Sequence, residues 1–220
     1  MAVEPNRKVG KYEGFSNNTT NLVQMALADL KRQENICFEV KHPEVTENLA
    51  TVLEHDRINV YLTNILMGMQ DPDVYMHCLR TSIMAGELAL KFEVLSKACV
   101  EVQEMLAAAV LHGYDRQVKA ASEMPEEEKR IDYRPRPKVD LSPVGKVYPV
   151  ALEIASVNPS PNGEIQIKKQ ILEIADLTDL VCKSASRPGE PPEVVAKMIK
   201  QRYSNHPVAE HVIYNCLMIV

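Results

Sequence analysis

The stretch DPDVYMHCLRTSIMAGELALKF (residues 71–92) predicts a long helix with a well-defined beginning. Asp71 suits the N-cap position, Pro72 suits the first helical position, and the acidic side chain of Asp73 favours the positive end of a helix. His77 lies in the first turns of this helix. The stretch therefore decides both the helical character of the chain and the place of a candidate metal ligand.

Helical spacing recurs on both sides of this stretch. Thr19 or Thr20 can cap a first helix, and the sequence after Pro43 carries one or two more. The helix over residues 96–114 has Ser96 as its expected cap and Gly113 as its expected terminator. Residues 34–43 are β-like in composition and are taken as a connector, and residues 150–157 suit a strand or a helix. Further helices are expected over residues 165–185, 191–204 and 207–220.

The middle of the chain differs in composition from the segments with helical spacing. Residues 123–149 contain five prolines, so no long helix can pass through them. With three Phe, no Trp and ten Met, the core must be built mainly from aliphatic side chains and thioethers. These features predict an all-α fold, a compact helical bundle with a proline-rich central loop region.

Composition excludes several classes of protein. The 220 residues carry a formal net charge of −5 and no basic cluster that follows an aromatic stripe, so we expect no nucleic-acid polymer as partner. The five cysteines are scattered and include no C-x-x-C pair, which is typical of buried thiols in a reducing compartment. No apolar run reaches 18 residues, so we expect no membrane partner and a cytoplasmic location.

Three residues on three expected helices can carry metal chemistry: His77, His112 and Asp176. Two imidazoles and a carboxylate can hold one divalent ion with an open position. Each residue also has a plainer interpretation, since His77 shares a face with core residues and Asp176 can pair with Lys183 or point to solvent. Taken singly, none of the three indicates a metal site.

Taken together, the motifs around these residues resemble the HD-GYP domain of the HD superfamily of metal-dependent phosphohydrolases. The segment EMLAAAVLHGYDR (residues 104–116) is similar to the family's A-A-L-L-H-D-I-G-K, and EIADLTDL (residues 173–180) is similar to V-A-D-x-F-D-A-L. Order and approximate spacing agree over about residues 58–215. The resemblance implies an HD-like helical domain over residues 58–220, preceded by an N-terminal arm and helices over residues 1–57.

The chain departs from the family pattern at its hallmark. Gly113 replaces the aspartate that bridges two metals in the family, while Arg116 keeps a cation at the lysine position. The family's second hallmark falls on residues 139–149 or on residues 149–159. Neither segment supplies its histidine ligands, because no histidine lies between His112 and His206. The resemblance therefore implies one metal at most.

We expect a catalytically inactive HD-GYP-like domain that binds a protein partner or a cyclic dinucleotide in signalling. An active phosphohydrolase with a mononuclear site is the alternative, and an unrelated all-α interaction module is a third. No cofactor is expected beyond a single iron or manganese ion in the active alternative. Phosphate contacts are assigned to Arg116, Arg134 and Arg136. The apolar C-terminal segment (residues 211–220) either packs under the domain, which we favour, or forms the seam of a homodimer.

Overall fold

The computed structural model describes residues 19–68, 72–112, 139–156, 158–182 and 189–219. Within these ranges the regular structure is helical, so the predicted all-α class is confirmed, and the bridge between Ile36 and Leu217 is isolated. The helices are α1 (Thr19–Arg32), α2 (Pro43–Leu53), α3 (Asp56–Gly68), α4 (Pro72–Lys91), α5 (Cys99–Leu111), α8 (Ser142–Val147), α9 (Ala151–Ala155), α10 (Gly163–Asp179), α11 (Pro192–Arg202), α12 (Pro207–His211) and the π-helix η1 (Val212–Cys216).

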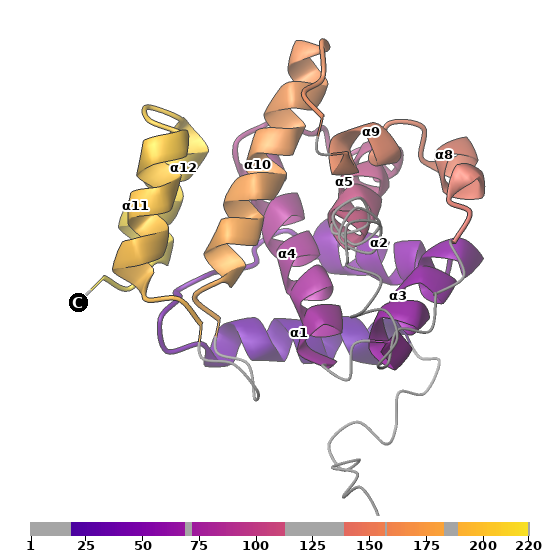
Figure 1. Cartoon of the computed structure of the whole chain (residues 1–220), viewed down its shortest axis with the longest axis horizontal. Coiled ribbons are helices and arrows are strands. Elements are labelled where there is room, and N and C mark those ends of the chain that lie inside the picture. The colour runs from indigo at the N-terminus through magenta and orange to yellow at the C-terminus, as the bar shows by residue number, and fades with distance from the viewer. Residues whose placement is uncertain (1–18, 69–71, 113–138, 157, 183–188, 220) are drawn as a thin grey trace, which may run out of the picture.

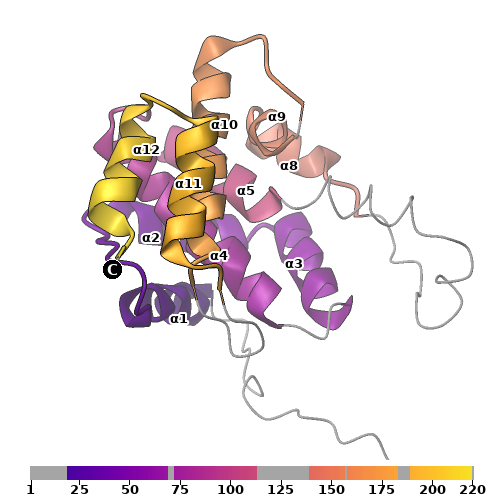
Figure 2. The ribbon, with the colours of Figure 1, turned by 60° about the vertical axis from the view of Figure 1, so that its left-hand side comes forward.

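Helix α4 lies at the centre of the bundle. It packs against α5 and α10 most extensively, and α1, α2 and α3 also contact it (Figures 1 and 2). Its interior side chains Met76, Leu79, Ile83 and Met84 are almost completely buried, as the aliphatic and thioether composition predicted. The central position of α4 allows its residues to meet side chains from two neighbouring helices at once.

The second half of helix α5 is buried on every side. Each residue from Met105 to Leu111 is buried, because α2, α4 and α9 all pack around this helix. The prediction that Ser96 caps α5 is wrong, since the helix begins at Cys99 after Ala98. The Ser96 hydroxyl instead accepts a hydrogen bond from the Ala98 N–H and donates one to Glu101 Oε2.

Two short helices, α8 and α9, precede α10. The ambiguous residues 150–157 contain α9, so the helical alternative is the right one for Ala151–Ala155. Helix α10 begins after Asn162, whose side-chain oxygen accepts hydrogen bonds from the backbone N–H groups of Glu164 and Ile165. This cap fixes the beginning of a helix whose last turn carries Asp176 and Asp179.

The connector after α1 and the C-terminal segment meet beside α4. The connector after α1 pairs with the C-terminal segment, where the Cys37 N–H donates to the Cys216 carbonyl oxygen at 2.7 Å. Cys216 and Leu217 are buried, which confirms core packing for this part of the C-terminal segment. One hydrophobic core includes residues from both sides of the predicted boundary at residue 57, and the division itself stays a prediction. None of the described helices has the length and apolar character needed to cross a membrane.

A large side chain at Gly86 should destabilise the bundle. A Cβ atom there would lie 2.9 Å from Leu106 Cδ2 and 3.2 Å from Val45 Cγ1, so a Leu side chain would push α4 away from α5 and α2. We expect Gly86→Leu to lower the free energy of unfolding by about 1–3 kcal/mol in urea denaturation. Gly163→Ala is the control, since nothing lies within 4 Å of its Cβ position. An unchanged stability of Gly86→Leu would contradict this packing.

Candidate metal centre

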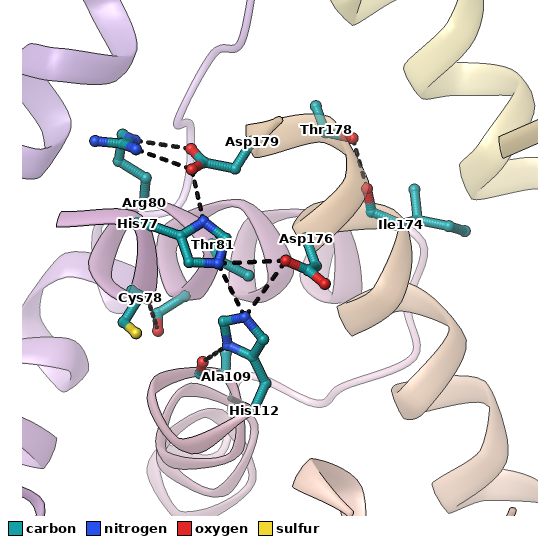
Figure 3. A network of polar contacts seen from close by, with 11 residues as sticks. His77, Cys78, Arg80, Thr81, Ala109, His112, Ile174, Asp176, Thr178 and Asp179 are labelled. Atoms are coloured by element: carbon teal, nitrogen blue, oxygen red, sulfur yellow. Dashed lines mark hydrogen bonds and ion pairs between the residues drawn. The ribbon is translucent and has the colours of Figure 1, made fainter. Parts of the chain in front are cut away.

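Three helices bring the candidate ligands to one point (Figure 3). His77 projects from the second turn of α4, His112 directly follows the last residue of α5, and Asp176 lies in the last turn of α10. One potential ligand atom from each residue lies within 4.8 Å of the other two. The structure therefore unites the three residues that the sequence singled out.

The facing atoms form a nearly regular triangle. His77 Nε2 lies 3.1 Å from His112 Nε2, and these two nitrogens lie 3.3 Å and 3.4 Å from Asp176 Oδ1. Neighbouring ligand atoms are about 3.0 Å apart in an octahedral site and about 3.4 Å apart in a tetrahedral site when the metal–ligand bonds are about 2.1 Å long. The spacing of the triangle is thus the spacing that a single divalent ion requires.

Hydrogen bonds on the far side of each imidazole set its orientation. The Nδ1–H of His77 donates to Asp179 Oδ2 at 2.8 Å, and the Nδ1–H of His112 donates to the Ala109 carbonyl oxygen at 2.5 Å. In neutral imidazoles, these bonds leave the lone pair of each Nε2 directed at the other ring and at Asp176. Donation of the second ring nitrogen to a carboxylate or a carbonyl is the usual arrangement of metal-binding histidines.

Asp179 is itself held by a buried arginine. The guanidinium of Arg80 donates from Nε to Oδ1 at 2.7 Å and from Nη2 to Oδ2 at 2.9 Å, and both side chains are 2% exposed. This two-point pairing fixes the plane of the carboxylate. Asp29 of α1 also lies 3.7 Å from Nη1 of Arg80. The orientation of His77 is therefore coupled to the packing of α4 against α10.

The electrostatic environment favours a cation between the three residues. Burial alone would lower the pKa of His77, but the hydrogen bonds and charges of Asp176 and Asp179 outweigh it and raise this pKa to about 9. Burial would raise the pKa of Asp176, but the hydrogen bonds of His112 and His77 hold it well below its usual range. Without a metal ion, a proton on His77 supplies the positive charge that these acceptors require.

A small cavity adjoins the triangle. His112 and Asp176 line it together with Lys169 and Glu173 from α10 and the loop after α9, and its volume is about 30 Å³. A polar cavity of this size has room for at least one water molecule. The Lys169 ammonium donates to the carbonyl oxygens of Ser156 and Asn158 and so holds the loop that forms one wall.

The other predicted site residues lie outside the described part of the chain. This applies to Arg116, Arg134 and Arg136, and also to Gly113 and Lys183. Asp176 does not point to solvent, because its carboxylate faces His77 and His112 and is largely buried, while its pairing with Lys183 stays a prediction. The phosphate contacts assigned to the three arginines stay predictions.

Sequence reasoning missed Arg80 and Asp179. Each lies three residues after a predicted ligand on the same helix, Arg80 after His77 and Asp179 after Asp176. Residues three apart share a helix face. Charged residues at these two positions could have indicated the support of a metal site, because ligand histidines commonly donate to a carboxylate.

Comparisons of the chain with protein-family models, with curated proteins and with solved structures found no match. Membership of the HD-GYP family therefore stays a prediction that rests on the motifs around residues 71–92, 104–116 and 173–180.

The raised pKa of His77 predicts how the stability of the metal-free protein depends on pH. A protonated His77 stabilises the fold fully below its unfolded pKa of 6.5, and this contribution is lost as the pH rises through the folded pKa of about 9. We expect the free energy of unfolding to fall by on the order of 2–3 kcal/mol over this interval, relative to a His77→Gln variant. Urea denaturation of both proteins in the presence of a chelator measures the difference. Parallel pH profiles would contradict the assignment.

Asp179→Asn should weaken metal binding without removing a ligand. Loss of the carboxylate behind His77 is expected to raise the Kd for a divalent ion about 10–100-fold, as measured by calorimetric titration. The same variant should lower the free energy of unfolding by about 3–5 kcal/mol, because the buried Arg80 guanidinium loses the two charge-assisted hydrogen bonds to Asp179. Asp29→Asn is the matched control, since this carboxylate is more exposed and lies 3.7 Å from Arg80. Equal effects of the two substitutions would contradict the supporting role of Asp179.

Proposed function

We propose that this chain is a degenerate HD-type domain that binds one divalent metal ion through His77, His112 and Asp176 and acts in ligand or partner binding in signalling. The observation that carries the proposal is the triangle of facing atoms, 3.1–3.4 Å apart. Both imidazoles in it are oriented by the hydrogen bonds that their Nδ1–H groups donate.

The donor set favours iron or manganese. Two imidazole nitrogens and one carboxylate oxygen on one face of an ion leave further coordination positions open, and this set is typical of non-haem iron(II) sites. When bound, such an ion supplies Lewis acidity toward a phosphate oxygen or a water molecule. The protein residues hold the two rings in place and keep Asp176 ionised, because His77 and His112 lower the pKa of its carboxyl group.

The ligand set supports binding in preference to hydrolysis. Efficient metal-dependent phosphodiesterases of the two-metal type hold two ions a few Å apart with bridging and terminal ligands. Gly113 stands where the resemblance expects the bridging aspartate, and no histidine lies between His112 and His206. Within the described ranges, the three residues form the one group of histidine, cysteine or acidic side chains placed to hold an ion. We therefore propose one ion and a bound phosphate ester, for example in a cyclic dinucleotide, with Arg116, Arg134 and Arg136 as its cationic contacts.

A mononuclear phosphohydrolase is the second candidate function. The observation in its favour is the cavity of about 30 Å³ beside His112 and Asp176, which has room for a water molecule next to the proposed ion. In this alternative the residues of the site are the same, and the difference lies in turnover.

Metal stoichiometry tests the proposed site. We expect the full chain, purified without oxygen and supplied with iron(II) or manganese(II), to hold one ion per chain by elemental analysis. His112→Gln and Asp176→Asn should each lower the affinity for the ion by more than about 100-fold, because each removes a metal ligand. Loss of a group that only supports a ligand already lowers the affinity about 10–100-fold. His55→Gln, a histidine outside the cluster, should bind like the parent. Equal binding by all variants, or no ion in the parent chain, would contradict the proposal.

Turnover separates the two candidate functions. We expect the metal-loaded chain to bind a cyclic dinucleotide, measured by calorimetry, and to leave both this ligand and bis(p-nitrophenyl) phosphate intact. Hydrolysis that disappears in His112→Gln and persists in His55→Gln would establish the phosphohydrolase instead. Because the assay uses metal-loaded protein, its result is distinct from that of the stoichiometry test.

A further inference from the structure

Two cysteines lie opposite each other where the connector after α1 meets the C-terminal segment. Ile36 and Leu217 form an antiparallel bridge. Cys37 follows the first of these residues and Cys216 precedes the second, so the two cysteines occupy opposite positions in the same register. The Cys37 N–H donates to the Cys216 carbonyl oxygen at 2.7 Å, which joins the two residues directly.

The spacing of opposite residues in such a pair suits a disulfide. Their Cα atoms lie about 4.5–5.5 Å apart and their Cβ atoms about 4.5–5.5 Å apart, on one face of the pair. Disulfides join Cα atoms that are about 4.4–6.8 Å apart and Cβ atoms that are about 3.5–4.5 Å apart. The backbone spacing therefore already fits, and an approach of the Cβ atoms by about 1 Å completes the geometry.

Both cysteines line one pocket, which the connector, the last turns of α4 and the C-terminal segment enclose. Cys37 is exposed, whereas Cys216 is 3% exposed. The pocket volume of about 360 Å³ is in the range of small-molecule sites, so a small reagent can reach Cys37 first. Among the described residues, neither thiol belongs to a group that could hold a metal ion. The pair is thus placed for thiol chemistry.

The two segments that carry these cysteines are each held at the end of α4. On one side, the Glu87 carboxylate accepts hydrogen bonds from the backbone N–H groups of Lys41 at 2.8 Å and His42 at 3.1 Å. On the other side, the Lys91 ammonium donates to Nε2 of His211 at 2.9 Å. Because both segments are anchored to one helix, the two thiols are kept close together without a covalent link.

We propose that Cys37 and Cys216 form a reversible disulfide when the chain meets a low-molecular-weight disulfide such as oxidised glutathione. The proposal is independent of the metal centre. Disulfides in a reducing compartment are usually transient and redox-sensing, which agrees with the compartment expected from the sequence. A disulfide with one exposed sulfur is readily reduced again.

The reaction proceeds by two exchange steps. The thiolate of Cys37 attacks one sulfur of oxidised glutathione, and one glutathione thiolate leaves, so that Cys37 carries the other half as a mixed disulfide. Cys216 then loses its proton, attacks Sγ of Cys37 and expels the second glutathione thiolate. The two cysteines lose two electrons and two protons, and oxidised glutathione is reduced to two thiols.

The environment of Cys216 agrees with this order of attack. Burial raises the pKa of its thiol to about 11, and of the two groups beside it Lys91 lowers this pKa while Cys37 raises it. Cys216 is therefore protonated at pH 7 and reacts second, after the exposed Cys37 has formed the mixed disulfide.

The new bond would close a loop of about 180 residues and tie the C-terminal segment to the connector. Cross-links that close long loops restrict the unfolded chain most strongly. We expect the oxidised chain to have a Tm higher than that of the reduced chain by on the order of 5–10 °C.

Peptide mapping tests the proposal on the full-length chain. The reduced protein is incubated with oxidised glutathione under nitrogen with a chelator, the remaining thiols are alkylated, and the protein is digested without reductant. We expect mass spectrometry to find a peptide that joins Cys37 to Cys216, and dithiothreitol to remove it together with the rise in Tm. Glutathione retained on Cys37 without this peptide, or a peptide that joins other cysteines or two chains, would overturn the proposal.

Three variants assign the two steps. Cys37→Ser should lose both the cross-linked peptide and the rise in Tm, and it leaves the fold intact because this side chain is exposed. Cys99→Ser, which removes the other exposed thiol, should keep both. Cys216→Ser should stop at the mixed disulfide on Cys37. An equal rise in Tm in Cys37→Ser and Cys99→Ser would contradict the pairing.

Discussion

The carboxylate of Asp179 links His77 of the candidate metal centre to the buried Arg80 in the core of the bundle. It accepts two hydrogen bonds from Arg80 and one from His77, and it lies at the last residue of α10 while its partners lie on α4. Loss of this carboxylate would remove two charge-assisted hydrogen bonds from the buried Arg80 guanidinium and the bond that orients the His77 imidazole. The packing of α4 against α10 and the direction of His77 therefore depend on the same contact.

Three acceptors that face one another need a positive charge between them. In the metal-free protein a proton on His77 meets this need, which agrees with its raised pKa, and a divalent ion would meet it at all three atoms at once. His112 reaches the same point from the end of α5, whose residues from Met105 to Leu111 are all buried. Both imidazole rings have a hydrogen-bond partner at Nδ1 without any ion, so the donor set is oriented in advance.

Much of the fold and part of the site followed from sequence patterns. The helix beginning at Pro72 and the convergence of His77, His112 and Asp176 were predicted from caps and motif order, while residues 113–138 of the proline-rich region lie outside the described residues. The beginning of α5 was not, because Ser96 finds a better partner in Glu101 than in the backbone of the helix. Arg80 and Asp179 each lie three residues after a predicted ligand, a local signal that the prediction did not use, but the ion pair between them joins residues 99 positions apart, which no local pattern encodes.

The central claim is that one ion binds between His77, His112 and Asp176. Its most direct test is a crystal structure of the manganese- or iron-loaded chain with diffraction data on both sides of the metal absorption edge. The account predicts a single anomalous peak at about 2.0–2.3 Å from the two Nε2 atoms and from one carboxylate oxygen of Asp176. A peak bound elsewhere, or an intact triangle with no peak at saturating metal, would contradict it.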